Sequence, residues 1–229
     1  MTRGILITGN ESTLSQAIAG EAAKRVEHYA SALITSRLSE PLELAAQTDK
    51  QSSHEQAGIA LQWNPGSPIS ARTLILAAEN RLEHINDAIL VCAPPSVRRP
   101  AAELSLSDIE TLVNDHIKGW FFLVRELASI FRAKKKGTLA LVFYEIGTGG
   151  GKDDPADTLG PSALASFQAL TRSLLASAHN EPYLTMGFSC AEAGAETGFA
   201  SYIFKILDEG NRKNNGKLHK YGKLSFFSK

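Results

Sequence analysis

The chain of 229 residues has little cysteine, few aromatic residues and no net charge. Two cysteines are too few for a disulfide framework, so a reducing setting is favoured and we expect a cytoplasmic protein. No apolar run approaches the roughly 20 residues that cross a bilayer, which predicts that the chain does not span a membrane. The first residues carry one charge and a short apolar patch, which indicates a strand rather than a signal peptide.

The overall composition is that of an ordinary globular protein. Hydrophobic residues make up 43% of the chain and charged residues 21%, which excludes a disordered chain, a collagen-like repeat and a coiled coil. No repeat or linker divides the sequence. We therefore expect a single domain over residues 1–229.

The zero net charge conceals an asymmetric distribution. Residues 211–229 contain six basic residues and no acidic one, which leaves 18 basic against 24 acidic residues in the rest of the chain. A basic tail can bind nucleic acid or an anionic surface. We expect a solubilising tail instead, since aromatic residues are few and no nucleic-acid-binding motif is present.

Strand-like and helix-like segments alternate along the whole chain. Short apolar runs predict strands at 5–8, 32–35, 59–63, 88–92, 138–143, 183–189 and 217–221. Helical periodicity predicts helices at 12–28, 70–83, 107–135 and 161–178, and a last helix that ends at Gly210. This alternation predicts a doubly wound α/β fold, with a parallel sheet of about seven strands between two layers of helices.

Terminal signals sharpen the limits of two helices. Ser107-Asp-Ile-Glu110 has the spacing of a capping box and would open the longest helix. Three lysines followed by Gly137 would end that helix. Pro161 is expected in the first turn of the next one.

Five segments in order resemble the short-chain dehydrogenase/reductase superfamily. They are Thr8-Gly-Asn-Glu-Ser-Thr-Leu-Ser15, Asp87-Ala-Ile-Leu-Val-Cys-Ala-Pro94, His116-Ile-Lys-Gly119, Gly137-Thr-Leu-Ala-Leu-Val-Phe-Tyr144 and Leu170-Thr-Arg-Ser-Leu174. The first resembles the T-G-x-x-x-G-x-G turn that holds a dinucleotide pyrophosphate at a helix N-terminus. The resemblance implies a Rossmann fold, a nicotinamide cofactor and an oxidoreductase.

The positions that carry catalysis in that family differ here. The resemblance places Gly160 at the family's tyrosine and Leu164 at its lysine, and neither side chain has a titratable group. The catalytic serine position falls on Tyr144 and the structural asparagine on His116. In the phosphate turn only Gly9 is kept, although Ser-Thr-Leu-Ser is similar to the turn of the enoyl reductase branch, which binds nicotinamide cofactors.

The resemblance also assigns a set of cofactor contacts. NADP is preferred to NAD, because Arg37 could pair with a 2′-phosphate and no acidic residue follows the second strand. The alternative for Arg37 is a solvated surface position. The assigned residues are Gly9, Ser12, Thr13, Leu14, Ser15, Ser36, Arg37, Asn64, Ala93 and Pro94.

Other groups could carry chemistry but have simpler interpretations. His116 and Tyr144 are expected to point toward the carboxyl ends of the strands, where they could exchange protons with a substrate or only fill space. Lys152 lies in a Gly-rich loop that could close over the cleft. Asp153, Asp154 and Asp157 do not have the spacing of a calcium loop, so no metal is expected. Cys92 and Cys190 are expected to end the fourth and sixth strands, which the fifth strand separates. This distance is too long for a disulfide between them.

The same family forms dimers or tetramers through the two helices expected at 107–135 and 161–178. Trp120, Phe121 and Phe122 are apolar around more than one helix face, which favours such an oligomer. Three functions remain open: a non-catalytic sensor or complex subunit that keeps some NAD(P) binding; a divergent NADP-dependent carbonyl or enoyl reductase using Tyr144 or His116; and an interaction module with no dinucleotide.

Overall fold

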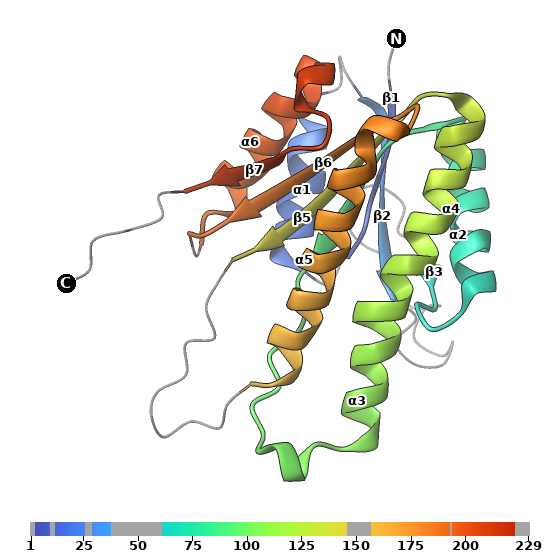
Figure 1. Cartoon of the computed structure of the whole chain (residues 1–229). Coiled ribbons are helices and arrows are strands. Elements are labelled where there is room, and N and C mark those ends of the chain that lie inside the picture. The colour runs from blue at the N-terminus through green and yellow to red at the C-terminus, as the bar shows by residue number, and fades with distance from the viewer. Residues whose placement is uncertain are drawn as a thin grey trace, which may run out of the picture.

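A computed structural model of the chain describes residues 3–9, 12–25, 29–37, 61–145, 157–192 and 194–222 (Figure 1). Its strands are β1 Arg3–Ile7, β2 Tyr29–Arg37, β3 Leu61–Trp63, β4 Ile85–Cys92, β5 Thr138–Tyr144, β6 Leu184–Cys190 and β7 Leu218–Tyr221. Its main helices are α1 Thr13–Ala23, α2 Pro68–Leu82, α3 Leu106–Val113, α4 Gly119–Lys134, α5 Leu159–Ser177 and α6 Glu196–Glu209. Short helical turns are η1 Ala101–Glu103, η2 Asn114–Lys118, η3 Ala178–Asn180 and η4 Arg212–Asn214.

The described strands form one seven-stranded sheet in the order β3-β2-β1-β4-β5-β6-β7, and all pairings are parallel. A parallel sheet needs helical crossovers that cover both faces, and its strands are therefore apolar on both sides. Ile5, Leu6 and Ile7 in β1 are each fully buried. The predicted doubly wound fold is confirmed.

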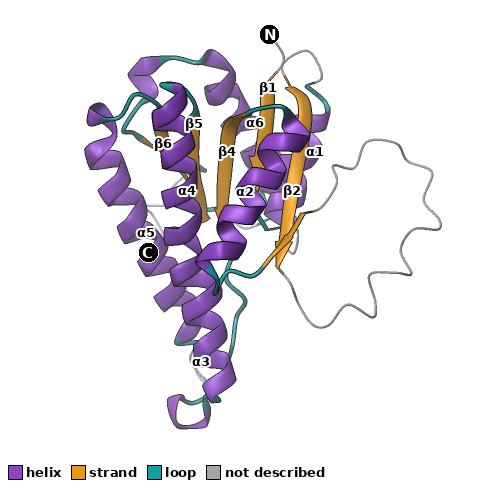
Figure 2. Cartoon of the chain, turned by 90° about the vertical axis from the view of Figure 1, so that its right-hand side faces the viewer, coloured by secondary structure: helices purple, strands orange, loops and turns teal. Residues whose placement is uncertain are grey.

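Helices lie on both faces of the sheet (Figures 1 and 2). One apolar cluster joins the sheet to α2, α4 and α5, with Trp120, Phe131 and Phe167 among its members. The other joins it to α1 and α6, with Leu14 and Phe199 among its members. This three-layer arrangement brings the carboxyl ends of the parallel strands to one edge of the molecule.

The helix predicted at 107–135 differs in its start and its continuity. The capping box is formed by Ser105 and Asp108: Ser105 Oγ accepts the Asp108 amide at 3.0 Å, and Asp108 Oδ2 accepts the Ser105 amide at 3.1 Å. Ser107 therefore lies inside the first turn of α3, and the predicted box at that serine was wrong. Both serines have an acidic residue three positions later, so the spacing alone does not choose between them.

A π-helical turn, η2, separates α3 from α4. Gly119 begins α4 against the segment after β3, where a Cβ would lie 2.8 Å from Pro65 Cβ. His116 lies within the π turn and is 1% exposed. Turns of this kind often occur at functional sites, and periodicity does not predict them.

The helices α6 and α4 both end at a residue with left-handed backbone, but only at α6 is that residue the predicted glycine. Gly210 follows α6 with φ 55°, as expected for a glycine cap. After α4 the left-handed residue is Lys135, with φ 53°, rather than Gly137. The lysine run itself closes the helix, since the amides of Lys135 and Lys136 donate to Arg132 and Phe131.

The C-terminal part of the described chain forms the predicted last strand. Of the six basic residues in 211–229, Arg212, Lys213, Lys217 and Lys220 are described, and all are exposed. Lys223 and Lys229 lie outside the described residues. Cys92 and Cys190 are buried on β4 and β6, with β5 between them, and no disulfide joins the two, as expected. Within the described ranges, no helix has the length and apolar character that a bilayer crossing requires.

We expect acid to weaken the fold through His219 on β7. Its ring stacks on Phe188, with centroids 5.3 Å apart. Burial lowers the pKa of His219 from 6.5, Lys217 lowers it further, and the Asn214 carbonyl and Glu209 oppose this. Because the unfolded chain then binds the proton more readily, the free energy of unfolding decreases as the pH falls below 6.5 toward the lower folded-state pKa.

Urea denaturation at about pH 8 and about pH 5.5 measures this effect. The His219→Phe variant keeps the aromatic contact and removes the titrating group. We expect the variant to lose less stability than the wild type between the two pH values. An equal loss in both proteins would contradict the assignment to His219.

Candidate functional site

The strand order reverses between β1 and β4, so this is the point where doubly wound folds bind ligands beyond the carboxyl ends of the strands. Thr8 joins the two strands there: its Oγ1 accepts the Val91 amide at 2.9 Å, and its amide donates to the Ile89 carbonyl at 3.0 Å. Thr8 is 1% exposed. The turn that follows β1 is therefore held to β4 before the chain enters α1.

Gly9 and Ser12 shape that turn. Gly9 has φ 84°, which favours glycine, and its carbonyl accepts the Ser12 amide at 3.0 Å. Ser12 caps α1, because its Oγ accepts the Ser15 amide at 3.0 Å. The amides of Thr13 and Leu14 then stand in the first turn, where a helix supplies no acceptor for them. Such amides, at the positive end of the helix dipole, can hold an anion.

The other predicted residues of this turn contribute through their backbone. Leu14 is 1% exposed and belongs to the apolar cluster with α6. Ser15 is fully buried, with its Oγ 2.7 Å from Ser12 Oγ. Thr13 is exposed. Of these three residues, Thr13 presents its side chain to solvent, whereas Leu14 and Ser15 support the turn.

The ends of β2 and β3 are placed by their pairing. Ser36 and Arg37 pair with Gln62 and Trp63 in parallel register. The Ser36 and Arg37 side chains lie outside the described part of the structure. Asn64 follows β3 and is exposed; its Oδ1 accepts the Gly66 amide at 2.9 Å. The structure thus brings Gly9, Arg37 and Asn64 to the same edge of the sheet.

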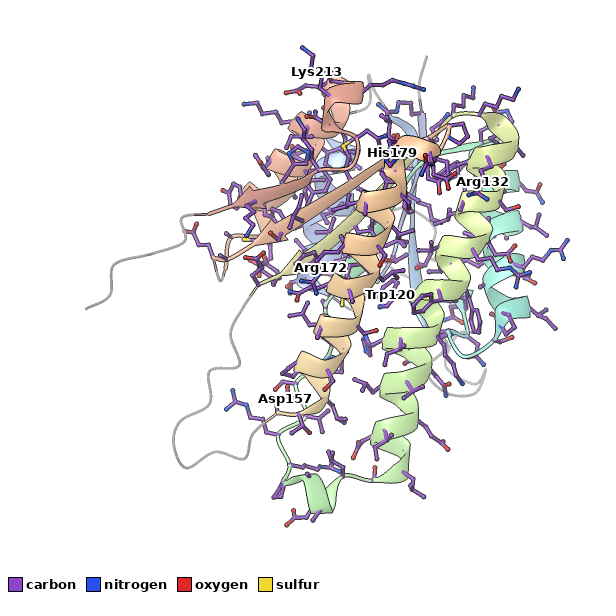
Figure 3. The ribbon with its side chains drawn as sticks, in the orientation of Figure 1. Trp120, Arg132, Asp157, Arg172, His179 and Lys213 are labelled. Atoms are coloured by element: carbon purple, nitrogen blue, oxygen red, sulfur yellow. The ribbon has the colours of Figure 1, made fainter. Side chains whose placement is uncertain are left out.

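The segment after β4 runs toward the beginning of α5. Ala93 is exposed and Pro94 half-buried. Arg98 forms an antiparallel bridge with Asp157, which lies at the foot of α5 (Figure 3). Asp157 Oδ1 accepts the amides of Leu159 at 3.1 Å and Gly160 at 3.0 Å. Asp157 thus caps α5 through the amides two and three residues later, a role that was not predicted from the sequence.

Gly160 is buried in this corner, and a side chain there would force its neighbours to shift. A Cβ there would lie 2.7 Å from Asp157 Oδ2 and 3.3 Å from the Pro95 carbonyl oxygen. Leu164, one turn later, packs against the apolar cluster under α4 and α5. At the position that aligns with the family's tyrosine, this chain thus has a glycine whose backbone is closely packed. At the position that aligns with the lysine, it has a leucine that packs in the apolar cluster.

Tyr144 lies on the face of the sheet that α1 and α6 cover. Its ring is 6.0 Å from that of Phe199 in α6, whereas the preceding Phe143 packs on Phe167 in α5 at 6.2 Å. Burial, assisted by the nearby Glu196 carboxylate, raises the pKa of Tyr144 well above its usual range. A phenol in this environment is a poor source of a proton or of a phenolate at neutral pH.

His116 lies on the opposite face. The π turn that carries it packs against α5, and Trp120, one turn further on, contacts Phe167 at 5.1 Å. Side chains alternate along a strand, so Tyr144 at the end of β5 points away from this layer. The π turn of His116 and the ring of Tyr144 thus pack against different helices, α5 and α6, and the expectation that both point toward the carboxyl ends of the strands stays a prediction.

The remaining predicted groups have separate outcomes. Lys152, Asp153 and Asp154 lie outside the described residues. Across the described ranges, no group of three or more His, Cys, Asp or Glu residues could hold a metal ion. Trp120 is 3% exposed and serves the core, so it is unavailable to a partner. Phe121 is 52% exposed and Phe122 is partly buried.

Comparison with known proteins identifies the fold. No family model matches the amino-acid sequence, and no curated protein matches it either. A short-chain dehydrogenase from Bacillus anthracis superposes with a TM-score of 0.71 at 18% identity, over 96% of this chain and 94% of that one. One from Mycobacterium smegmatis gives 0.72 at 12% identity, over 97% and 93%. An NADH-dependent reductase complexed with NAD gives 0.69 at 12% identity, over 99% and 98%. The predicted resemblance is confirmed in the fold: this chain has the architecture of the short-chain dehydrogenases.

Proposed function

We propose that this protein binds a nicotinamide dinucleotide and does not reduce or oxidise a substrate, and that it serves as a sensor or as a subunit of a complex. The observation that carries the proposal is the packing of Gly160 against Asp157 and Pro95. A proton donor at this position would need space that the chain fills with its own atoms. The fold and the turn after β1 support nucleotide binding, and the filled corner argues against catalysis.

The residues at the turn after β1 fit a diphosphate. The first amides of α1 and the left-handed backbone of Gly9 would hold its oxygens, as at other helix N-termini that follow a parallel strand. A nicotinamide dinucleotide would supply hydride chemistry, but Gly160 and Leu164, which align with the family's tyrosine and lysine, have no proton to exchange with a substrate. The NAD complex of the structurally similar reductase supports this ligand class.

Arg37 supports a preference for NADP over NAD. It is the last residue of β2, beside β3, where the adenosine ribose lies in dinucleotide-binding sheets. A guanidinium group there would pair with a 2′-phosphate through charge-assisted hydrogen bonds.

A divergent reductase is the weaker alternative. It would need Tyr144 or His116 as the proton donor, and the Tyr144 ring packs against Phe199 of α6. The raised pKa of Tyr144 also opposes that role.

Nucleotide binding is tested by melting the protein with NADPH or NADH. A ligand that binds only the folded state stabilises it by RT ln(1 + [L]/Kd), or about 2.7 kcal/mol at 100 times Kd. We expect Gly9→Ala to weaken binding by about tenfold, because an alanine at φ 84° strains the turn by about 1–2 kcal/mol. Gly20→Ala in α1 is the matched control, since a Cβ there meets nothing within 4 Å. Melting temperatures that stay constant up to millimolar nucleotide would reject this part of the proposal.

The absence of catalysis is tested with carbonyl and enoyl substrates. We expect no turnover above background with either nucleotide. We also expect none from Gly160→Tyr combined with Leu164→Lys, because the tyrosine meets Asp157 and the Pro95 carbonyl. Turnover by the wild type that disappears in Tyr144→Phe or His116→Ala would establish the reductase instead.

We also propose that the protein self-associates through α3 and α4, which cover the first of the two helices, 107–135 and 161–178, expected to form an oligomer. Leu106, Ile109 and Phe121 are 80%, 40% and 52% exposed, and burying them would remove apolar surface from water. Light scattering should report an oligomer for the wild type and a smaller mass for Phe121→Glu. Lys205→Glu, at an exposed position of α6 on the other side of the sheet, should leave the mass unchanged. A monomeric wild-type protein at all concentrations would refute the interface.

A further inference from the structure

We propose that the carboxyl edge of this sheet engages only the adenosine diphosphate half of its ligand and leaves the nicotinamide half without a binding site. The inference rests on the proposed nucleotide binding and narrows it to one moiety. It predicts that the protein recognises adenine nucleotides as a class and distinguishes poorly between a dinucleotide and ADP.

The two halves of a doubly wound sheet bind the two nucleotides of a dinucleotide. The diphosphate lies at the reversal between β1 and β4, the adenosine half extends over β2 and β3, and the other half extends over β4 and β5. The second half therefore needs space beyond Cys92 and Tyr144, between the helical layers that flank these strand ends.

On the α5 side, the chain itself occupies this space. The bridge between Arg98 and Asp157 draws the segment after β4 onto the first turn of α5. Asp157 is fixed there by the amides of Leu159 and Gly160, and the Pro95 carbonyl closes the gap above Gly160. A ring inserted at this place would have to break the bridge and the cap together.

On the α6 side, aromatic rings fill the corresponding position. The Tyr144 ring packs on Phe199, and Phe199 stacks on Tyr221 with centroids 5.6 Å apart. The Tyr221 hydroxyl presses against Gly198 in the first turn of α6, where a Cβ could not be accommodated. Tyr221 is the last residue of β7, so the final strand closes this corner. A nicotinamide ring would have to displace Tyr144 or Tyr221.

The adenosine half has no comparable obstruction among the described residues. Thr13 and Asn64 are exposed, and Gly9 brings no side chain to the turn. The same edge therefore offers backbone amides and exposed polar groups on one side of the reversal, and packed aromatic rings and paired backbone on the other. This asymmetry is what the inference depends on.

Calorimetric titration of the full chain with matched ligand pairs tests the inference. ADP and NADH differ by the nicotinamide riboside, as do 2′-phospho-ADP and NADPH, and nicotinamide mononucleotide represents the second half alone. We expect Kd values within about fivefold inside each pair and no saturable binding of the mononucleotide. A dinucleotide that binds more than about fivefold tighter than its partner overturns the inference and leaves the proposed nucleotide binding intact. If none of these nucleotides binds, the proposed function fails as well.

A variant separates a ring that fills space from a ring that contacts nicotinamide. In Tyr144→Ala we expect NADH and ADP to keep equal affinities. Tyr202→Ala is the control. Tyr202 belongs to α6, and its ring packs on that of Tyr221 with centroids 5.3 Å apart. A loss of more than about fivefold for NADH alone in Tyr144→Ala would overturn the inference, since a ring stacked on nicotinamide gives that result. The wild-type titration decides the matter without either variant.

Discussion

The close approach of Gly160 to Asp157 and Pro95 determines what the carboxyl edge of this sheet can do. A glycine at this position lets the segment after β4 reach the first turn of α5, and the bridge between Arg98 and Asp157 holds it there. Asp157 then caps the helix with the amides of Leu159 and Gly160. These contacts stabilise the first turn of α5 and fill the space beside it with the chain's own atoms. The residues that stabilise the start of α5 thus occupy the space through which a ligand would reach the ends of the strands.

The reversal of strand order divides the edge into two unlike halves. Around β1 the turn is stiffened by Thr8 and Ser12 and presents the amides of α1. Beyond β4 the strand ends are covered by Tyr144 and Phe199 on one side and by the Gly160 corner on the other. A doubly wound sheet does not require both halves to bind a ligand, because each half is closed by its own loops. The proposed recognition of nucleotides without catalysis rests on this difference between the two halves.

The fold follows from local sequence patterns, whereas the site depends on contacts between distant segments. Buried runs such as Ile5–Ile7 and the glycine cap at Gly210 are determined within a few residues, and the strand and helix order followed from them. Strand alternation also required Phe143 and Tyr144 to face opposite layers. Which layer each faces depends on how α5 and α6 cross the sheet, and the sequence does not state this. The same holds for the π turn around His116 and for the bridge between Arg98 and Asp157.

Saturation-transfer NMR with NADH tests the central claim most directly, because it reports which protons of the ligand touch the protein. We predict that saturation reaches the adenine and adenosine-ribose protons and leaves the nicotinamide protons near the level of free ligand. Equal transfer to the nicotinamide ring would contradict the account, because that ring would then contact the protein beyond β4 and β5, where Tyr144 and the segment beside Gly160 leave it no site.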